Sequence, residues 1–529
     1  MHNMNKIKLY CIFLVVCLLA GCVGFGQTTA SSAPETQAYW PSSNWRSSVP
    51  EEQGMDSELL AQMFGQIEER QLNMHSVLIV RNGYLVTEAY FDPYTQNQKQ
   101  QIYSVTKSVI STLVGIAIQK GYIKDTDQTL VNFFPGRGMA NLDERKKAIT
   151  LKDLLTLTAG LTCEDTPFTN APRMDQSAYW FQFMLDLPMD AQPGTKWNYC
   201  GGMVHLLSAI LQETTGMSTR DFANRFLFEP MGIPNVTEIH WPSDPQGRTY
   251  GMTGLWLTPR EMAKLGYLYL NHGKWNDTQI FSEDWLKEAT TSYITRDNGL
   301  GYGYLWTVDP EKGYYIALCY AGQHIYVVPD KNLVIVFTAA LPATKMNEDF
   351  FPLKALVDNY ILPAVKSDQE LPSNPDAELK LNAFISKAAY PRGSVPPLPE
   401  GAQQWSGVVY QMDENPYGWE TMSFEIQPGS NTILVNINRQ VVDIGSDHQF
   451  RIVGQSEPDQ VNMLAPTALR GEWINGNTLL IKSIKLGEVV GFWGEIDYLV
   501  IFSTDEINLT GKYVVSGQEV TYHGKQMED

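Results

Sequence analysis

The spacing of apolar residues changes twice along the first 365 residues, and these changes predict the order of the elements. Runs at 76–80 and 84–90 are rich in β-branched and aromatic residues, and Asn82-Gly83 between them is a strong hairpin signal. Between about 150 and 295 the apolar residues follow a helical period, in segments that include 151–157, 202–214 and 259–270. Strands are predicted again near 300–340.

This order of strands, helices and strands favours one α/β (α+β) domain over residues 45–366. We expect a single antiparallel sheet to which both ends of the domain contribute, with helices packed against it. Asp56 precedes an amphipathic segment and is a typical N-cap, so a helix is predicted from residue 57. The apolar run at 109–118 predicts a buried helix that begins near Ser104.

The pattern changes again after the first domain. Prolines are frequent at both ends of residues 367–400, which we interpret as a linker. Residues 401–529 then show short alternating runs divided by turn signals such as Asn475-Gly476. This pattern predicts a small all-β barrel or sandwich, and it contains no catalytic motif.

The N-terminus has the pattern of an export signal. Lys6 and Lys8 precede an apolar run at 9–19, which is too short to span a bilayer but suits a signal peptide. The run ends in Leu19-Ala20-Gly21-Cys22, which resembles the lipobox of prokaryotic lipoproteins. We therefore expect a signal peptide at 1–21, lipidation of Cys22 and a polar tether at 22–44. The protein would be a cell-envelope lipoprotein, anchored to a membrane on its extracytoplasmic side.

The net charge limits the possible partners, and the cysteine content limits the possible metal sites and disulfides. The 529 residues carry a formal net charge of −19, which argues against a nucleic-acid partner. Three cysteines remain after the signal peptide, Cys163, Cys200 and Cys319, and they form no metal-binding cluster. They could form at most one disulfide, and buried free thiols are the favoured interpretation.

One pair of residues indicates chemistry. Ser104 and Lys107 are three residues apart, so on a helix they would share a face, and a neutral lysine there could take the serine proton. Acting as a base near neutrality requires the lysine pKa to fall from about 10.4. Burial could supply that shift. A Ser-x-x-Lys sequence is nevertheless expected about once by chance in a chain of this composition.

Two further segments give the pair a context: Pro193-Gly194-Thr195-Lys196-Trp197-Asn198-Tyr199-Cys200-Gly201-Gly202, and the segment 315–329. With Ser104-Val105-Thr106-Lys107 they resemble the serine hydrolases related to class C β-lactamases and penicillin-binding proteins. The likeness is nearest to the carboxylesterase and 6-aminohexanoate-dimer hydrolase branch, and it covers about residues 45–365. It implies a β-lactamase/transpeptidase-like fold.

The resemblance also implies a role for each matching residue. Ser104 would be the acylated nucleophile, Lys107 its base, and Tyr199 the phenol that carries protons to the leaving group and from water. The oxyanion hole would consist of the backbone N–H groups of Ser104 and Tyr320.

The resemblance places Gly201, Cys319 and Gly322 where the substrate would bind, and at the first two of these positions the chain departs from the family pattern. Gly201 stands where the Tyr-x-Asn motif has its asparagine. Ala317-Leu318-Cys319 stands where the family has Lys-Thr-Gly or His-Thr-Gly, so that strand lacks the cation that binds the carboxylate of a β-lactam. These departures favour ester or amide hydrolysis over β-lactamase activity.

The sequence therefore predicts an exported serine hydrolase for a small ester, amide or peptide substrate, with no metal or cofactor. His324 is interpreted as structural and His205 as a core residue. Two alternatives stay open: a β-lactamase or D-Ala-D-Ala carboxypeptidase, and a catalytically weak lipoprotein that binds ligands in the same cleft.

Overall fold

The structure is a computed structural model of the chain. It describes residues 39–163, 174–342, 350–391, 393–454, 466–486 and 494–527. The predicted signal peptide, the lipidation site Cys22 and most of the tether lie outside the described residues. Residues Trp40–Asp529 form one compact unit. No helix in the described ranges is long and apolar enough to cross a bilayer.

A nine-stranded sheet forms the centre of the first domain, in the order β1-β3-β2-β13-β12-β11-β10-β9-β8. The hairpin of β2 (Met74–Arg81) and β3 (Tyr84–Tyr90) turns at Asn82 and Gly83, both with positive φ, as the sequence predicts. β13 (Leu333–Ala339) pairs antiparallel with β2, so strands from both ends of the domain meet in the middle of one sheet. This confirms the predicted topology, with β1 (Arg46–Ser47) as a parallel edge strand.

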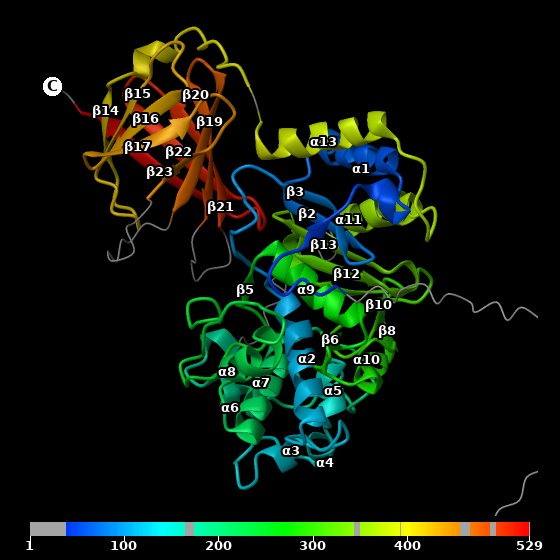
Figure 1. Ribbon diagram of the computed structural model, residues 1–529. Helices are drawn as coiled ribbons and strands as arrows, with labels where there is room; N and C mark the ends of the chain where they lie inside the picture. Colours follow the sequence, from blue (N-terminus) through cyan, green and yellow to red (C-terminus); the bar gives the residue numbers. More distant parts are fainter. Residues whose placement is uncertain are drawn as a thin grey trace, which may run out of the picture. The chain divides into compact units, whose positions relative to one another are not determined.

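Helices cover both faces of this sheet (Figure 1). α1 (Ser57–Glu69), α11 (Phe350–Leu356) and α13 (Pro375–Ala389) pack on one face against alternate strand residues such as Ile79 and Phe337. α2 (Val105–Gln119) and α9 (Pro259–Leu270) pack on the other face, against residues such as Val80. The alternation of side chains along each strand divides the core into these two layers.

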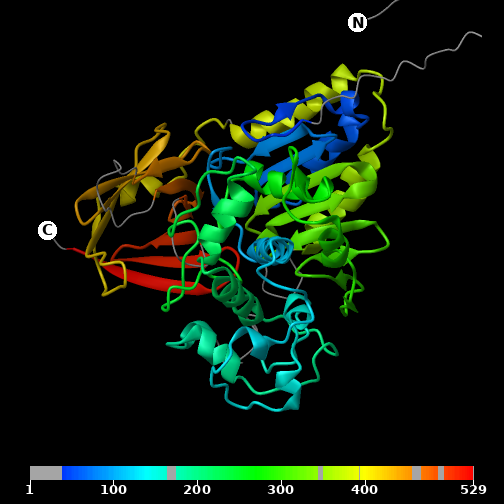
Figure 2. The same cartoon turned by 60° about the horizontal axis from the view of Figure 1, so that its bottom comes forward.

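Helix α2 is buried on all sides from Val105 to Ala117. Figure 2 shows it between the sheet and the green helical segments, which include α7 (Gly201–Thr215). A helix dominated by an apolar run, here residues 109–118 with Ser111 and Thr112 as the polar exceptions, is most stable inside the protein, which explains this position. Gly115 permits it, because a Cβ there would lie 2.4 Å from the ring of Trp285. The N-terminus of α2 is thereby held next to the sheet.

The C-terminal residues form a closed β-barrel. Strands β14 (Val409–Met412) to β23 (Glu519–Gln526) make one antiparallel sheet, and a parallel pairing of β17 (Gln440–Gly445) with β19 (Thr467–Asn475) closes it. The barrel alternative of the sequence prediction is therefore confirmed.

The predicted linker at 367–400 contains a helix. α13 spans fifteen residues and packs on α1, where the rings of Phe64 and Phe384 stack 6.5 Å apart. Two residues mark the start of this helix in the sequence: Asn374, which caps it, and Pro375 at its first position. The interpretation of residues 367–400 as a linker did not include this helix.

A buried carboxylate of the barrel, Glu495, contacts the first domain. It accepts hydrogen bonds of 2.6 Å from Asn73 Nδ2 and Tyr94 Oη, and its Oε1 lies 2.7 Å from Nε2 of His75. Burial opposes its ionisation, but the attraction of His75 and these hydrogen bonds outweigh it and hold the pKa of Glu495 below its ordinary value.

Candidate active site

Ser104 caps helix α2 at its N-terminus and is half-buried. The preceding residue, Tyr103, has φ of +42°, a conformation that costs a non-glycine residue energy and often marks a functional site. The Ser104 side chain makes no capping hydrogen bond to the helix. Its hydroxyl is directed to other groups instead.

Lys107 lies one turn further along α2, and its Nζ is 2.8 Å from Ser104 Oγ. The side chain is only 5% exposed. Nζ also donates a 2.8 Å hydrogen bond to the carbonyl oxygen of Met252. The amine is therefore held between the Met252 carbonyl oxygen and the Ser104 hydroxyl.

Tyr199 reaches the same hydroxyl from the segment just before α7. Its Oη lies 2.7 Å from Ser104 Oγ, and its ring centroid is 5.0 Å from Lys107 Nζ. The structure thus brings together the three residues to which the sequence assigned the reaction. A serine hydroxyl within hydrogen-bond reach of both an amine and a phenol has the partners that can activate a nucleophile and protonate a leaving group.

A disulfide joins Cys163 to Cys200, with their Cα atoms 5.8 Å apart. The prediction that these two are free thiols is therefore wrong, whereas Cys319 is a buried thiol outside the disulfide. The sequence could not identify the pair, because three cysteines allow three different disulfides and a separation of 37 residues favours none of them. Because Cys200 directly follows Tyr199, the bond restrains the segment that presents the phenol.

Replacing both Cys163 and Cys200 with serine is expected to lower the free energy of unfolding by about 2–4 kcal/mol, because the unfolded chain regains the entropy of an open loop. Activity should fall as well, because the disulfide no longer restrains the segment that carries Tyr199. Urea unfolding and kcat/KM of the double variant measure the two effects. Wild-type protein treated with reductant is the matched control and should behave like the variant. Equal stability of variant and wild type would contradict the prediction.

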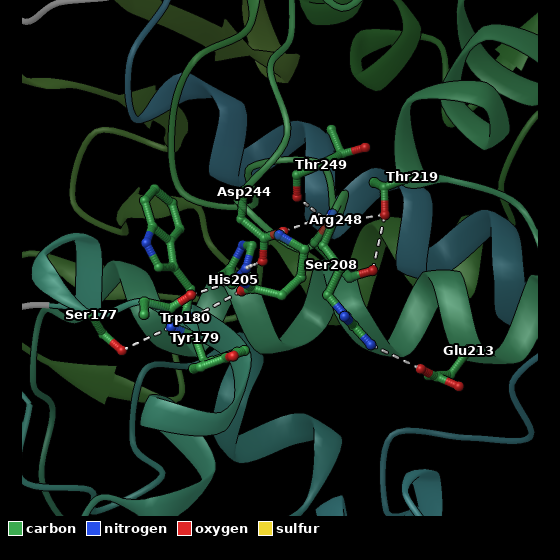
Figure 3. A network of polar contacts seen from close by, with 12 residues as sticks. Ser177, Tyr179, Trp180, His205, Ser208, Glu213, Thr219, Asp244, Arg248 and Thr249 are labelled. Atoms are coloured by element: carbon green, nitrogen blue, oxygen red, sulfur yellow. Dashed lines mark hydrogen bonds and ion pairs between the residues drawn. The ribbon is translucent and has the colours of Figure 1, made fainter.

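A buried polar network supports the loop that carries Met252 (Figure 3). His205 on α7 lies 2.9 Å from Asp244 Oδ2, and both side chains are fully buried. Asp244 Oδ1 accepts 2.8 Å hydrogen bonds from the backbone N–H groups of Gln246 and Arg248. His205 is a core residue, as predicted, but Asp244 has no local motif and the sequence analysis missed it.

The same loop packs tightly on α7 through Gly251. A Cβ at this glycine would lie 2.2 Å from the carbonyl oxygen of Val204. Ser208 on α7 also donates 2.7 Å to the carbonyl oxygen of Thr249. The loop therefore delivers the Met252 carbonyl to Lys107 at a fixed position.

Asp244→Asn is expected to lower the free energy of unfolding at pH 7 by about 2–3 kcal/mol, because hydrogen bonds to a buried charge are lost. Burial opposes the charge, but His205 and the two backbone donors outweigh it and hold the pKa of Asp244 below its ordinary value. The contribution of a carboxylate with a lowered pKa is present above the unfolded pKa, near 3.9, and is lost as pH falls through the folded one. Urea unfolding from pH 7 downwards should show the gap between variant and wild type narrowing below about pH 4. A gap that stays constant would contradict this.

The third predicted segment, 315–329, begins in β11 (Tyr314–Leu318) and continues through β12 (His324–Val328) to Pro329. The backbone N–H of Ser104 donates to the Sγ of Cys319 at 3.0 Å, so this strand end lies against the nucleophile. Tyr320 follows directly and begins a short turn. His324 is fully buried, and burial lowers its pKa to about 3, only partly offset by its hydrogen bond to the Cys319 carbonyl. It is a structural residue, as interpreted.

The other two predicted substrate-binding glycines lie in different surroundings. Gly201 is the first residue of α7, two positions after Tyr199. Gly322 has φ of +100°, and a Cβ there would meet Ala339 at 2.9 Å and Leu353 at 3.1 Å. These two residues belong to the core layer opposite α2, so Gly322 shapes the turn.

A cation that sequence reasoning missed lies near Tyr199. The Arg296 guanidinium is 5.6 Å from the ring centroid of Trp197 and 5.7 Å from that of Tyr302. Burial lowers the pKa of Arg296, although Tyr302 and Tyr199 oppose the shift. No motif marks this residue in the sequence.

Comparison with known proteins places this arrangement in a family. The family model described as Beta-lactamase matches residues 59–356, more than half of the chain. The chain belongs to the Beta-lactamase family. This family of serine hydrolases includes esterases and amidases.

The chain is also similar to three individual proteins. An uncharacterised protein of Alkalihalophilus pseudofirmus is 26% identical over 49% of this chain and 82% of its own length. The 6-aminohexanoate-dimer hydrolase of Paenarthrobacter ureafaciens is 21% identical over 56% of this chain and 80% of its own length. The structure of an octameric penicillin-binding protein homologue from Pyrococcus abyssi is 17% identical and has a TM-score of 0.46, with 88% of this chain and 99% of that chain covered.

Proposed function

We propose that this chain is an exported serine hydrolase that cleaves ester or amide bonds through an acyl-enzyme on Ser104. One observation carries the proposal: Ser104 Oγ lies within 2.8 Å of both the buried Lys107 amine and the Tyr199 phenol. A hydroxyl with a base and an acid in contact at once has the partners that both halves of an acyl transfer require.

In the first half, neutral Lys107 accepts the Ser104 proton while Oγ forms a bond to the substrate carbonyl carbon. The carbonyl π pair moves to its oxygen, and the backbone N–H groups of Ser104 and Tyr320 stabilise the resulting oxyanion. When the oxyanion collapses, the bond to the alcohol or amine breaks, and Tyr199 protonates that leaving group. The phenol regains a proton from Lys107.

In the second half, water replaces the leaving group. Tyr199 or Lys107 accepts a proton from water as its oxygen attacks the ester carbon, and the Ser104 Oγ leaves with that proton. The products are a carboxylic acid and the free serine. The transfer from Ser104 to Lys107 uses the 2.8 Å contact between Oγ and Nζ.

The test is intact-mass analysis of purified protein treated with a fluorophosphonate. A single adduct is expected on the wild type and none on Ser104→Ala, which should keep the same melting temperature. Hydrolysis of p-nitrophenyl butyrate and of 6-aminohexanoate dimer, the latter suggested by the relative's name, then separates esterase from amidase activity. Absence of any Ser104-dependent adduct would refute the proposal and favour a ligand-binding protein.

A second candidate activity is tested in the same experiment. Penicillin in place of the fluorophosphonate should give slow or no acylation, because Ala317-Leu318-Cys319 offers no cation for the drug's carboxylate. An adduct that forms and turns over rapidly would instead assign a β-lactamase.

We further propose that the protein is a lipoprotein anchored through Cys22. The support is the sequence alone, in the apolar run at 9–19 and the Leu19-Ala20-Gly21-Cys22 motif. Cys22→Ala should move the protein from the membrane fraction to the soluble fraction or block its processing. A variant that is both processed and fractionated like the wild type would refute the anchor and leave the hydrolase proposal untouched.

A further inference from the structure

The thiol of Cys319 lies where the proposed reaction needs an oxyanion. The backbone N–H of a serine nucleophile is one of the donors that stabilise the oxyanion, at about 2.7–3.1 Å from the oxygen. In this structure the Ser104 N–H donates to Cys319 Sγ at 3.0 Å. A substrate oxygen cannot accept from this N–H along the same direction while the sulfur occupies it.

The backbone of Cys319 holds the thiol in place. Its N–H donates to the carbonyl oxygen of Gln323 at 3.1 Å, and its own carbonyl oxygen accepts from His324 Nε2 at 3.1 Å. The residue is 5% exposed and His324 is completely buried. With both backbone groups bonded, rotation about the Cα–Cβ bond is the simple way for the sulfur to leave the Ser104 N–H.

We infer that Cys319 is a specificity-determining residue whose thiol fills the oxyanion hole of the resting enzyme and biases it towards esters over amides. The inference rests on the proposed acyl-enzyme mechanism. An amide has the poorer leaving group, so its reaction depends more on a well-stabilised oxyanion. An activated ester tolerates a hole that the thiol partly occupies.

The decisive variant is Cys319→Ala, which keeps the Cβ and the backbone but removes the sulfur. Its kcat/KM is compared with wild type on p-nitrophenyl butyrate and on the p-nitroanilide of the same acid, a matched ester and amide. We expect about a 10-fold to 100-fold gain on the anilide and a smaller gain on the ester. Cys319→Ser keeps an acceptor for the Ser104 N–H, so its gain should be smaller than that of alanine.

The rate of fluorophosphonate labelling separates this inference from the proposed function. The phosphoryl oxygen uses the same donors, so Ser104 should label faster in Cys319→Ala than in wild type. Equal or slower labelling and hydrolysis in a folded alanine variant would overturn the inference while Ser104 remains the nucleophile. Absence of labelling in every variant would overturn the proposed function itself. Should the alanine variant not fold, the serine variant gives the same comparison: a loss of anilide activity there would overturn the inference, and a gain would support it.

Discussion

Replacing Lys107 with methionine is expected to slow acylation of Ser104 by about 10³-fold, the typical contribution of a positioned general base. Methionine fills a similar volume but cannot accept the proton of Ser104 Oγ, which lies 2.8 Å from Nζ in the wild type. It also leaves the Met252 carbonyl without its donor. Stopped-flow measurement of the p-nitrophenol burst gives the acylation rate directly.

Lys264→Met is the matched control, since this lysine is also buried and burial lowers its pKa. Its Nζ donates to the carbonyl oxygens of Ser42, Met231 and Gly232. The control should lose stability and keep its acylation rate per folded molecule. Equal loss of rate in the two variants would show that Lys107 acts through folding rather than as the base.

Tyr199→Phe is expected to lower kcat/KM by about 10² to 10³-fold. The ring and its neighbours are retained, and only the hydroxyl that lies 2.7 Å from Ser104 Oγ is removed. Because the proposed mechanism has the phenol protonate the leaving group, the loss should be larger for an anilide than for a p-nitrophenyl ester, whose leaving group departs without a proton. Steady-state kinetics with the two substrates measures this ratio.

Tyr302→Phe controls for the loss of a neighbouring phenol. Tyr302 is buried, and desolvation raises its pKa, so it does not ionise near neutrality. The rings of Tyr302 and Tyr199 both lie next to the ring of Trp197. The control should leave the ester-to-anilide ratio unchanged. An equal loss on both substrates in Tyr199→Phe would contradict the acid role.

Local patterns in the sequence predicted the parts of the site that depend on one element or one motif. The burial of Lys107 follows from the apolar residues around α2, and the sheet follows from strong strand and hairpin signals at both ends of the domain. Tyr199 was placed by resemblance to a family motif. These features need no knowledge of distant contacts.

The features that were missed depend on contacts between distant segments. Asp244 meets His205 across 39 residues, and the Cys319 thiol reaches Ser104 across 215. No local period records such pairs, because only the completed sheet brings β11 to the start of α2. The helix at Pro375–Ala389 was missed for a different reason: the prolines at both ends led to the interpretation of the whole segment as a linker.

Glu495 places a buried carboxylate of the C-terminal barrel against polar residues of the first domain. If residues 401–529 were removed, Asn73, His75 and Tyr94 would lose a shared acceptor inside the protein, and the penalty for such stranded polar groups is large. The first domain is therefore expected to lose stability when a segment without a catalytic motif is removed. Substitutions on the barrel surface away from this strand end should be tolerated better than a substitution of Glu495.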